Sequence, residues 1–464
     1  MIIIFGATGD LAKRKLIPAI YQLVSKEVID CPVVCVSREK LTKEEYLKKV
    51  LLKKHVRGMD NKTLRKLKDK IYYFQQDLTE KKAPELAGFI KKIDKLHKCD
   101  GNKVFYLATP PLIFKHVTVL IKNNQLLNGR GYKRVVFEKP FGYDLASAEE
   151  LNQFVTSIFK EEEIYRIDHF LGKELVQNMV VLRFANPIFE QIWNKEFIDN
   201  VQIIIDEKEG VGLRGDYYDK AGAVRDMVQN HVLQVLSLIA MEHPETVKPE
   251  DLIKEKVKVL KKLNPVKPGN VVLGQYKGYR DEARVKKESN TETFAALKIT
   301  IDNDRWRGVP FYVRTGKCLS RNNQEVNVVL KDHACRLFCK NLDYKGPNVI
   351  SVRVKPNEGI SIQFNAKKPG HGLNIEPVVM DYCHVCRYPT NSPEAYELML
   401  HEVLMGNKTL FTDWQEVENS WKFINPVLKI KDKKSLEHYK KGTKCPEGAE
   451  ELLKRDGREW IEVT

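Results

Sequence analysis

The order in which strand-like and helix-like segments follow one another constrains the fold more than any other feature of this sequence. Over residues 1–140, short apolar runs alternate with helical stretches. The predicted strands are IIIF at 2–5, VVCVS at 33–37, IYYFQQ at 71–76, KVFYLATPP at 103–111 and KRVVFEKP at 133–140. Such alternation is typical of a parallel, doubly wound sheet.

After about residue 200 the pattern changes to a succession of strands. The predicted strands are NVQIIIDEK at 200–208, TFAALKITIDN at 293–303, VPFYVRTGK at 309–317, EVNVVLK at 325–331, NVISVRVKP at 348–356 and GISIQFNA at 359–366. The last five follow one another with no helix of any length between them, so a mostly antiparallel sheet with helices on one face is expected. We predict an α/β domain at residues 1–166 and a larger β+α domain at residues 167–464.

Composition restricts the class of protein. A chain of 464 residues is long enough for two or three domains. The longest nearly apolar run, VLQVLSLIAM at 232–241, is far shorter than the ~20 residues of a membrane span. It is predicted to be a buried helix. The N-terminal MIIIFG lacks the regions of a secretory signal, and we expect a cytoplasmic protein.

The cysteines and the charge balance exclude two further classes. Nine cysteines fit free thiols in a reducing compartment, and Cys383 and Cys386 have no second pair at zinc spacing, so no metal site is predicted. The net charge of +16 attracts anions. However, lysines alternate with acids in stretches such as LTKEEYLKKVLLKK, as on solvated helix faces. No nucleic-acid-binding motif is present, so nucleic acid is not an expected partner.

The stretch GATGDLAKRK at 6–15 follows the first predicted strand and opens a helix. Small residues at Gly6, Gly9 and Ala12 would let a pyrophosphate approach the backbone at the helix N-terminus. The G-x-G-x-x-G spacing is not matched, so an ordinary strand-to-helix turn is the alternative. The position at the first strand of an alternating pattern favours dinucleotide binding.

The second predicted strand ends at Ser37 and Arg38, where folds that prefer NAD commonly place an acid. A guanidinium offers a planar fork of donors to the 2′-phosphate of NADP. NADP is therefore the predicted cofactor. A surface arginine is the alternative, and the neighbouring Glu39 carries the opposite charge.

Two further segments carry lysines at positions where ligands bind. In VVFEKPFGYDL, Lys139 follows a strand and precedes Pro140, and an X-Pro bond can be cis and fix the lysine's direction. In YRIDHFLGKELVQN, Asp168, His169 and Lys173 crowd the start of a helix expected near Gly172. A lysine there faces the positive end of the helix dipole, at a cost of roughly 0.3 to 1 kcal/mol. An anion is therefore expected at this position.

His231 lies in a predicted helix within YYDKAGAVRDMVQNHVLQVLSLIAME. At helical spacing it shares an apolar face with Val224, so it could be a buried core histidine. If Asp168 reached it, the pair would form a general base with an orienting carboxylate, as removal of a hydroxyl proton requires.

These motifs together resemble one family. The order GATGDLAKRK, EKPFG, RIDHFLGKE, RDMVQNH and VRTGKCL, with the later KPNEG, KKPG, PEAYE and WKFINPVL, resembles glucose-6-phosphate dehydrogenase over nearly the whole chain. The resemblance implies a Rossmann-like domain followed by a larger β+α domain. It also implies oxidation of glucose 6-phosphate at C1 to 6-phosphogluconolactone with reduction of NADP, the first step of the oxidative pentose phosphate pathway. A homodimer or homotetramer is implied as well.

The resemblance also assigns roles to residues. His231 would remove the C1 hydroxyl proton while Asp168 orients its imidazole. His169 and Lys173 would hold the substrate phosphate, which answers the question of the expected anion. The residues assigned to the substrate are Lys139, His169, Lys173, Glu207, Asp226 and Lys317. The residues assigned to the cofactor are Gly6, Ala7, Thr8, Gly9, Asp10, Leu11, Ala12 and Lys13 for the diphosphate, Arg38 for the 2′-phosphate, and Lys139.

This sequence departs from the family pattern in several places. It begins almost on its first strand, so an N-terminal regulatory segment is expected to be absent. Phe170 stands where a tyrosine is usual, and the lost hydrogen bond would weaken phosphate binding by ~0.5 to 1.5 kcal/mol. Asn322 and Asn323 replace a basic pair, for which Arg321 would compensate in part.

Some family members hold a second, structural NADP with basic residues of the C-terminal domain. Arg314 and Arg353 match that pattern, but Asn323 and Asn327 do not. We therefore expect this second site to be unused.

Two alternatives remain. The chain could be an NAD(P)-dependent oxidoreductase of another sugar, because E-K-P at a strand end also occurs in families that act on unphosphorylated sugars. RIDHFLGKE disfavours it, since His169 and Lys173 would then lack an anion. The second alternative is a catalytically inactive NADP-binding sensor, which intact Lys139, Asp168 and His231 argue against.

Overall fold

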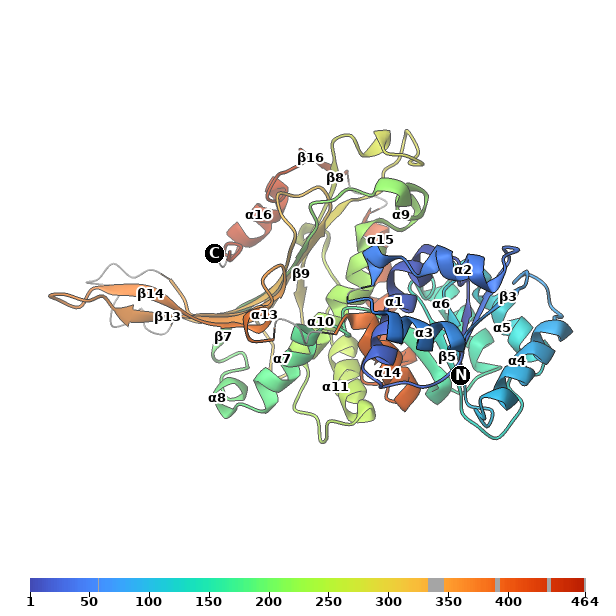
Figure 1. Cartoon of the computed structure of the whole chain (residues 1–464). Coiled ribbons are helices and arrows are strands. Elements are labelled where there is room, and N and C mark those ends of the chain that lie inside the picture. The colour runs from blue at the N-terminus through green and yellow to red at the C-terminus, as the bar shows by residue number, and fades with distance from the viewer. Residues whose placement is uncertain (57, 333–345, 389–392, 432–434, 463–464) are drawn as a thin grey trace. The chain divides into compact units, whose positions relative to one another are not determined.

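The computed structural model describes residues 1–56, 58–332, 346–388, 393–431 and 435–462 (Figure 1). The chain forms two compact units. Unit 1 comprises Met1–Gly172, Lys248–Ile253 and Pro393–Glu418, and unit 2 comprises Lys173–Val247, Lys254–Ser392 and Asn419–Thr464. The predicted domain boundary near residue 166 stays a prediction, because compact units need not coincide with independently folding domains.

Unit 1 contains a seven-stranded sheet in the order β15-β6-β5-β4-β1-β2-β3. All neighbours pair in parallel except β15 and β6. Its strands are β1 (Ile2–Phe5), β2 (Val33–Ser37), β3 (Ile71–Gln75), β4 (Lys103–Leu107), β5 (Lys133–Phe137), β6 (Ile164–Ile167) and β15 (Phe411–Thr412). The predicted doubly wound sheet is confirmed, and the strand order reverses between β1 and β4, where such sheets bind ligands.

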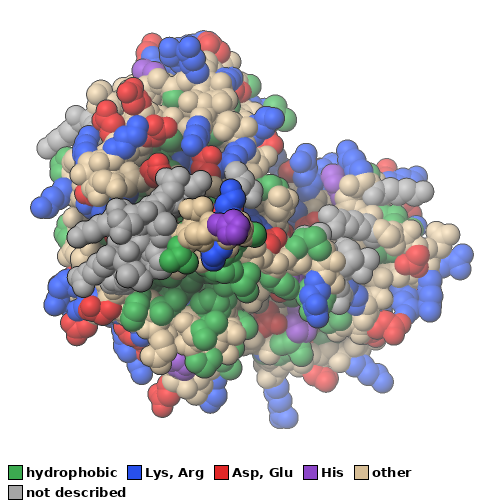
Figure 2. Space-filling view, turned by 90° about the vertical axis from the view of Figure 1, so that its left-hand side faces the viewer, with side chains coloured by type: hydrophobic (Ala, Val, Ile, Leu, Met, Phe, Trp, Pro, Cys, Tyr) green, Lys and Arg blue, Asp and Glu red, His purple; other side chains and the backbone are tan. Residues whose placement is uncertain are grey.

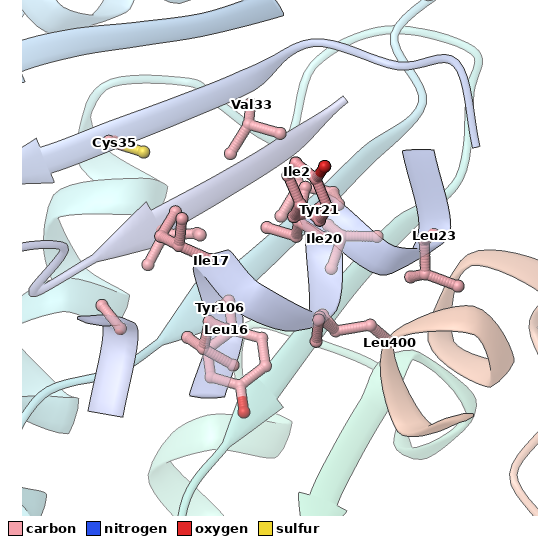
Figure 3. Packing of buried hydrophobic residues seen from close by; sticks show 14 of the residues in the cluster. Ile2, Leu16, Ile17, Ile20, Tyr21, Leu23, Val33, Cys35, Tyr106 and Leu400 are labelled. Carbon is pink, nitrogen blue, oxygen red and sulfur yellow. The ribbon is translucent and has the colours of Figure 1, made fainter. Parts of the chain in front are cut away.

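Helices surround this sheet. They are α1 (Ile17–Ser25), α2 (Lys43–Val50), α3 (Asn61–Lys70), α4 (Pro84–Leu96), α5 (Phe114–Asn123), α6 (Leu145–Thr156) and α14 (Ala395–Met405), with the π-helical η1 (Ala12–Leu16) leading into α1. Side chains of α1, such as Ile17 and Ile20, pack with Ile2 of β1 and with Leu400 of α14 in one buried cluster (Figure 3). The whole of β1 is buried because elements cover both of its faces.

Unit 2 contains a nine-stranded sheet in the order β14-β13-β12-β11-β7-β10-β9-β8-β16. Its strands are β7 (Ile198–Asp206), β8 (Val271–Tyr276), β9 (Phe294–Thr300), β10 (Pro310–Gly316), β11 (Asn323–Leu330), β12 (Val349–Lys355), β13 (Gly359–Lys367), β14 (Ile375–Cys383) and β16 (Glu437–Tyr439). Only β7 with β10 and β8 with β16 pair in parallel. The predicted mostly antiparallel sheet is confirmed, although residues 333–345, between β11 and β12, lie outside the described residues.

The helices of unit 2 include a long interrupted segment. Here α9 (Gly215–Ala223), the π-helical η6 (Val224–Val232) and α10 (Leu233–Ala240) follow one another. The other helices are α7 (Glu174–Phe184), α8 (Pro187–Glu190), α13 (His384–Arg387) and α16 (Glu447–Lys454), while α11 (Pro249–Lys261) and α15 (Trp414–Lys431) contribute residues to both units. Every residue of α10 is buried, as predicted for that apolar run.

The membrane and charge predictions can be compared with this fold. None of the helices in the described part of the chain has the length and hydropathy of a membrane span. On the face seen in Figure 2, Lys and Arg side chains are interspersed with Asp and Glu. In α2, which contains most of one lysine-rich stretch, Tyr46, Leu47 and Val50 are buried while Glu44 and Lys48 are exposed, as expected of a solvated helix face.

The cysteine prediction needs one correction. Cys383 and Cys386 are joined by a disulfide bond, so the prediction of free thiols throughout is wrong for this pair. They lie at the end of β14 and in the short helix α13, where a C-x-x-C spacing brings the two sulfurs within bonding reach. Among the described residues the free cysteines are Cys31, Cys35, Cys99, Cys318 and Cys445, and Cys335 and Cys339 lie outside them.

Candidate active site

Predicted site residues follow the strands of unit 1 at one edge of its sheet. Gly6 comes directly after β1, Arg38 after β2, Lys139 shortly after β5, and Asp168 after β6. Because these four strands run in parallel, their carboxyl ends share an edge of the sheet. Unit 1 therefore gathers residues that lie far apart in the sequence.

The turn after β1 has the close backbone approach that a dinucleotide requires. Gly6 has φ +85°, and a Cβ there would lie 2.5 Å from the carbonyl oxygen of Ala108. Gly9 donates its N–H to the carbonyl of Gly6 at 2.9 Å, and a Cβ at Gly9 would lie 3.1 Å from that same oxygen. The turn thus needs glycine at Gly6 and leaves little room for a side chain at Gly9, and it leads into a helix N-terminus suited to phosphate.

Hydrogen bonds tie this turn to the end of β2. Gly6 and Ala7 both donate their N–H groups to the carbonyl of Val36, at 2.9 and 3.1 Å. The hydroxyls of Thr8 and Ser37 lie 2.8 Å apart. The residues predicted to hold the diphosphate are therefore fixed beside the residues predicted to face the 2′-phosphate.

Arg38 is exposed at the end of β2. The neighbouring Glu39 forms an ion pair with Lys49, and this interaction lowers the pKa of the Glu39 carboxyl. Among the described residues, no carboxylate lies within ion-pair distance of the Arg38 guanidinium. The opposite charge of Glu39 is thus matched by Lys49, and Arg38 retains its donors for an anion.

Lys139 follows a half-buried acid, Glu138, that was not predicted as a site residue. The Lys139–Pro140 peptide bond is cis. The preceding Glu138 accepts a hydrogen bond from the Tyr106 hydroxyl at 2.5 Å and another from Tyr396 at 3.4 Å. Burial raises the pKa of Glu138 to about 7. The position of Glu138 inside the EKP motif was the available signal for this residue.

Asp168 and His169 occupy a tight turn directly after β6. Asp168 is buried, and its carboxylate accepts the backbone N–H of Phe170 at 3.0 Å. Its carbonyl accepts the N–H of Leu171 at 3.0 Å. Phe170 is itself buried, and the centre of its ring lies 5.2 Å from that of the His169 ring.

Lys173 lies where the sequence predicted it, at the start of a helix. It is the residue preceding α7, and its Nζ donates to Oε1 of Gln324 at 2.5 Å. Gln324 pairs in register with Ile205 near the end of β7. Lys173 is therefore held near the strand end that carries Glu207.

Asp226 and His231 lie on one side of the π-helical η6. In a π-helix the backbone hydrogen bonds join residues five apart, so residues 226 and 231 stand one turn apart. An α-helix would turn them to different sides. Both side chains are buried, and Asp226 accepts a hydrogen bond from Tyr217 at 3.1 Å. The predicted face shared with Val224 assumed an α-helical period, which this segment does not have.

Glu207 and Lys317 form an ion pair because their strands are parallel neighbours. Gly316 pairs in register with Asp206, so each residue immediately follows its strand at the same level. The Lys317 ammonium lies 5.1 Å from the centre of the Tyr218 ring. Burial raises the pKa of Tyr218, and the charges of Asp226, Glu292 and Glu207 raise it further. Unit 2 thus places Glu207, Lys317 and Asp226 around one tyrosine.

The site residues are therefore divided between the two units. Unit 1 holds residues 6–13, Arg38, Lys139, Asp168 and His169, and unit 2 holds Lys173, Glu207, Asp226, His231 and Lys317. Two rare π-helical segments, Ala12–Leu16 and Val224–Val232, coincide with the predicted cofactor turn and the predicted base. Such segments occur frequently at functional sites.

Comparison with known proteins decides the family. A family model described as "Glucose-6-phosphate dehydrogenase, NAD binding domain" matches residues 3–178, and one described as "Glucose-6-phosphate dehydrogenase, C-terminal domain" matches residues 180–461. The chain belongs to the glucose-6-phosphate dehydrogenase family. The resemblance seen in the motifs is thereby confirmed.

Individual members of the glucose-6-phosphate dehydrogenase family match over full length. A glucose-6-phosphate 1-dehydrogenase of Bacillus subtilis (strain 168) is 40% identical, over 100% of this chain and 98% of its own. One from Chlamydia muridarum is 39% identical over 99% and 96%. A solved glucose-6-phosphate dehydrogenase in complex with its substrate glucose-6-phosphate has a TM-score of 0.92 and 35% identity, covering 99% of this chain and 98% of that one.

Two departures from the glucose-6-phosphate dehydrogenase pattern have local explanations. Asn322 accepts the backbone N–H of Lys208 at 2.7 Å and donates to Glu209, so its amide holds the segment after β7. Arg321 lies 3.5 Å from the Glu462 carboxylate. Arg321 is thus engaged with a carboxylate, which weakens the expectation that it replaces a lost basic residue.

Proposed function

We propose that this chain oxidises glucose 6-phosphate at C1 to 6-phosphogluconolactone and transfers the hydride to NADP. The observation that carries the proposal is the full-length match, at 39% and 40% identity, to relatives named for this reaction. The predicted site residues support it, because each lies at a strand end, a helix start or a π-helical turn where the fold can use it.

The cofactor site is assigned to unit 1. The glycine turn at residues 6–13 fits a dinucleotide diphosphate, since its backbone approaches closely at Gly6 and Gly9. Arg38 binds the 2′-phosphate as a planar fork of donors. When bound, NADP supplies the hydride acceptor.

His231 serves as the general base. It takes the proton from the C1 hydroxyl as the hydride leaves C1, and Asp168 orients the imidazole and stabilises its charged form. Complete burial of the His231 side chain within this chain supports a role that excludes water. Catalysis then consists of positioning and one proton transfer.

His169 and Lys173 bind the phosphate group of the substrate. Lys173 immediately precedes α7, where backbone N–H groups and the helix dipole favour an anion. Glu207, Asp226 and Lys317 bind sugar hydroxyls or fix their neighbours, and Lys139 contacts both the substrate and the nicotinamide region. The phosphate thereby holds the sugar while the base acts at the other end.

An assay of NADPH formation by its absorbance tests the proposal. We expect turnover with glucose 6-phosphate and a far lower kcat/KM with glucose, because glucose lacks the anion for His169 and Lys173. Equal efficiency with both sugars would favour the oxidoreductase of an unphosphorylated sugar. No NADPH with any sugar, together with retained NADP binding, would favour an inactive sensor.

We also infer that the protein acts in the cytoplasm as a homodimer or homotetramer. The inference follows from the family, whose members are usually dimers or tetramers. Light scattering of the purified protein measures the assembly directly, and a monomeric mass at assay concentration would contradict it.

A further inference from the structure

Glu292 is a buried acid outside every motif considered so far. It lies two residues before β9, and its side chain is 0% exposed. A buried carboxylate is costly unless it is paired and hydrogen-bonded. Here Lys431, the last residue of α15, places its Nζ 2.6 Å from Oε2 of Glu292.

The other carboxylate oxygen of Glu292 contacts the start of the π-helix. Oε1 accepts the backbone N–H of Val224 at 3.1 Å, and the carbonyl of Glu292 accepts the N–H of Ala223 at 3.0 Å. These N–H groups lie at the start of η6, where backbone N–H groups have no hydrogen-bond partners within the helix. Glu292 therefore fixes the direction in which η6 begins.

The backbone at the kink is adapted to this contact. Gly222, the second-last residue of α9, has φ +70° and ψ 173°, a conformation that L side chains rarely adopt. A Cβ at Gly222 would overlap the carboxylate of Glu292. Only glycine lets the acid approach so closely, so the kink and the acid form one arrangement.

The charges of this arrangement match the helix dipoles. The Glu292 carboxylate lies at the amino end of η6, where a negative charge is favoured, and Lys431 lies at the carboxyl end of α15, where a positive charge is favoured. Asp226 follows Val224 by two residues, and His231 lies one π-turn further along η6. A shift of the first turn of η6 would therefore move both side chains.

We propose that Glu292, paired with Lys431, is a positioning residue that fixes the first turn of the π-helix carrying Asp226 and His231. Its influence on the reaction passes through that helix. The inference rests on the proposed function of His231, so its test includes a variant of that residue.

The test compares Glu292→Gln, Lys431→Met and the double variant in the NADPH assay. Each single variant should lower kcat by 10-fold or more, since a displacement of about 1 Å can cost on the order of 10²-fold. In Glu292→Gln, the amide oxygen still accepts the Val224 N–H, but the Lys431 ammonium loses its charged partner. In the double variant this ammonium is absent as well, so no unpaired charge remains. The double variant should therefore regain kcat relative to either single variant.

Lys298→Met is the matched control. Lys298 of β9 pairs with Asp456 at 2.6 Å in the same unit, but it holds the end of α16 rather than η6. We expect it to lower Tm without lowering kcat. The positioning role is refuted if Glu292→Gln and Lys431→Met lower Tm but have the same kcat as Lys298→Met. It is also refuted if the kcat of the double variant is no higher than that of either single variant. Should Glu292→Gln fail to fold, Lys431→Met and the double variant decide.

His231→Asn separates this inference from the proposed function. If His231→Asn loses turnover while the Glu292 and Lys431 variants retain it, only the positioning role fails. If His231→Asn keeps near-normal turnover, the assignment of the base fails first.

Discussion

Lys173 combines a position and a charge that favour one ligand. It precedes α7, where a cation is unfavourable by itself and an anion is stabilised by the helix dipole. A charge-assisted hydrogen bond to the substrate phosphate contributes ~1.5 to 3 kcal/mol. We therefore expect a substitution of Lys173 to affect substrate binding more than the chemical step.

Replacing Lys173 with Ala should raise KM for glucose 6-phosphate by roughly 10- to 100-fold, with a smaller change in kcat. Steady-state kinetics measure both constants. Lys267→Ala is the control, because Lys267 is an exposed lysine of the same unit that is not among the predicted site residues. An unchanged KM for Lys173→Ala would mean that the phosphate binds elsewhere.

Glu138 gives a pH-dependent prediction at the same scale. Its pKa is about 7 in the folded chain because it is buried, whereas the ordinary value is 4.5. Below pH 4.5, Glu138 is protonated in the folded and in the unfolded chain, so it does not change the free energy of unfolding. Above pH 7 both states are ionised, and burial of the charge destabilises the fold by up to about 3 kcal/mol. The destabilisation thus develops as pH rises from 4.5 to 7.

Glu138→Gln removes this ionisation, so the variant should gain stability relative to the wild type as pH rises through that window. Chemical unfolding at pH 5 and pH 8 measures the difference between the two proteins. A difference independent of pH would show that Glu138 does not titrate in this range.

At the scale of elements, the kink before η6 should depend on glycine. Gly222→Ala should destabilise the protein by more than the ~1 to 3 kcal/mol of a backbone conformation that essentially only glycine adopts, because the new Cβ also meets Glu292. Gly212→Ala is the control, since Gly212 also has a positive φ, of +53°, but a Cβ there would meet nothing within 4 Å. Thermal unfolding compares the two variants. Equal losses would mean that the carboxylate does not crowd Gly222.

Strands were predicted correctly where a short continuous run of apolar residues indicated a buried strand. Val33–Ser37 and Ile2–Phe5 are wholly buried, and their apolar runs predicted them with the observed bounds. In contrast, β6 was not predicted, because IYRI contains Arg166. Its guanidinium is buried yet bonded to Glu161 at 2.5 Å and Asn152 at 2.6 Å, partners that sequence does not show.

The helices illustrate a different limit. The helix containing His231 was predicted, and α7 begins within two residues of the expected Gly172. The π-helical period was not predictable, because apolar spacing is judged against an α-helical turn. Asp226 was therefore assigned to the site by resemblance alone, and the observed period supplies the physical reason that it lies on one side with His231.

At the scale of the whole molecule, local motifs predicted candidate site residues but not their neighbours. The turn after β1 and the end of β2 were predicted separately, and the Thr8–Ser37 contact joins them. Tyr218 and Glu292 were not predicted because their importance depends on burial, and Glu138 was not predicted because its partners Tyr106 and Tyr396 are distant in sequence. Residues in motifs are predictable from sequence, whereas the residues that support them require the packed structure.

The number of NADP molecules bound per chain is a property of the whole molecule. The two arginines that match the pattern of a second NADP site, Arg314 and Arg353, already have partners. The buried Arg314 pairs with the buried Asp206 at 2.8 Å, and its guanidinium lies 4.7 Å from the centre of the Trp460 ring. Arg353 forms an ion pair with Asp381. Freeing Arg314 would leave Asp206 as an uncompensated buried charge, which is strongly unfavourable.

We therefore expect one NADP per chain. Equilibrium titration of the full-length protein measures the stoichiometry, and Arg38→Ala should weaken that one site much more for NADP than for NAD, because only NADP carries the 2′-phosphate. A second NADP that still binds the Arg38→Ala variant tightly would contradict the expectation. It would require Arg314 to exchange Asp206 for a phosphate, with a large change in the environment of Trp460 that tryptophan fluorescence would detect.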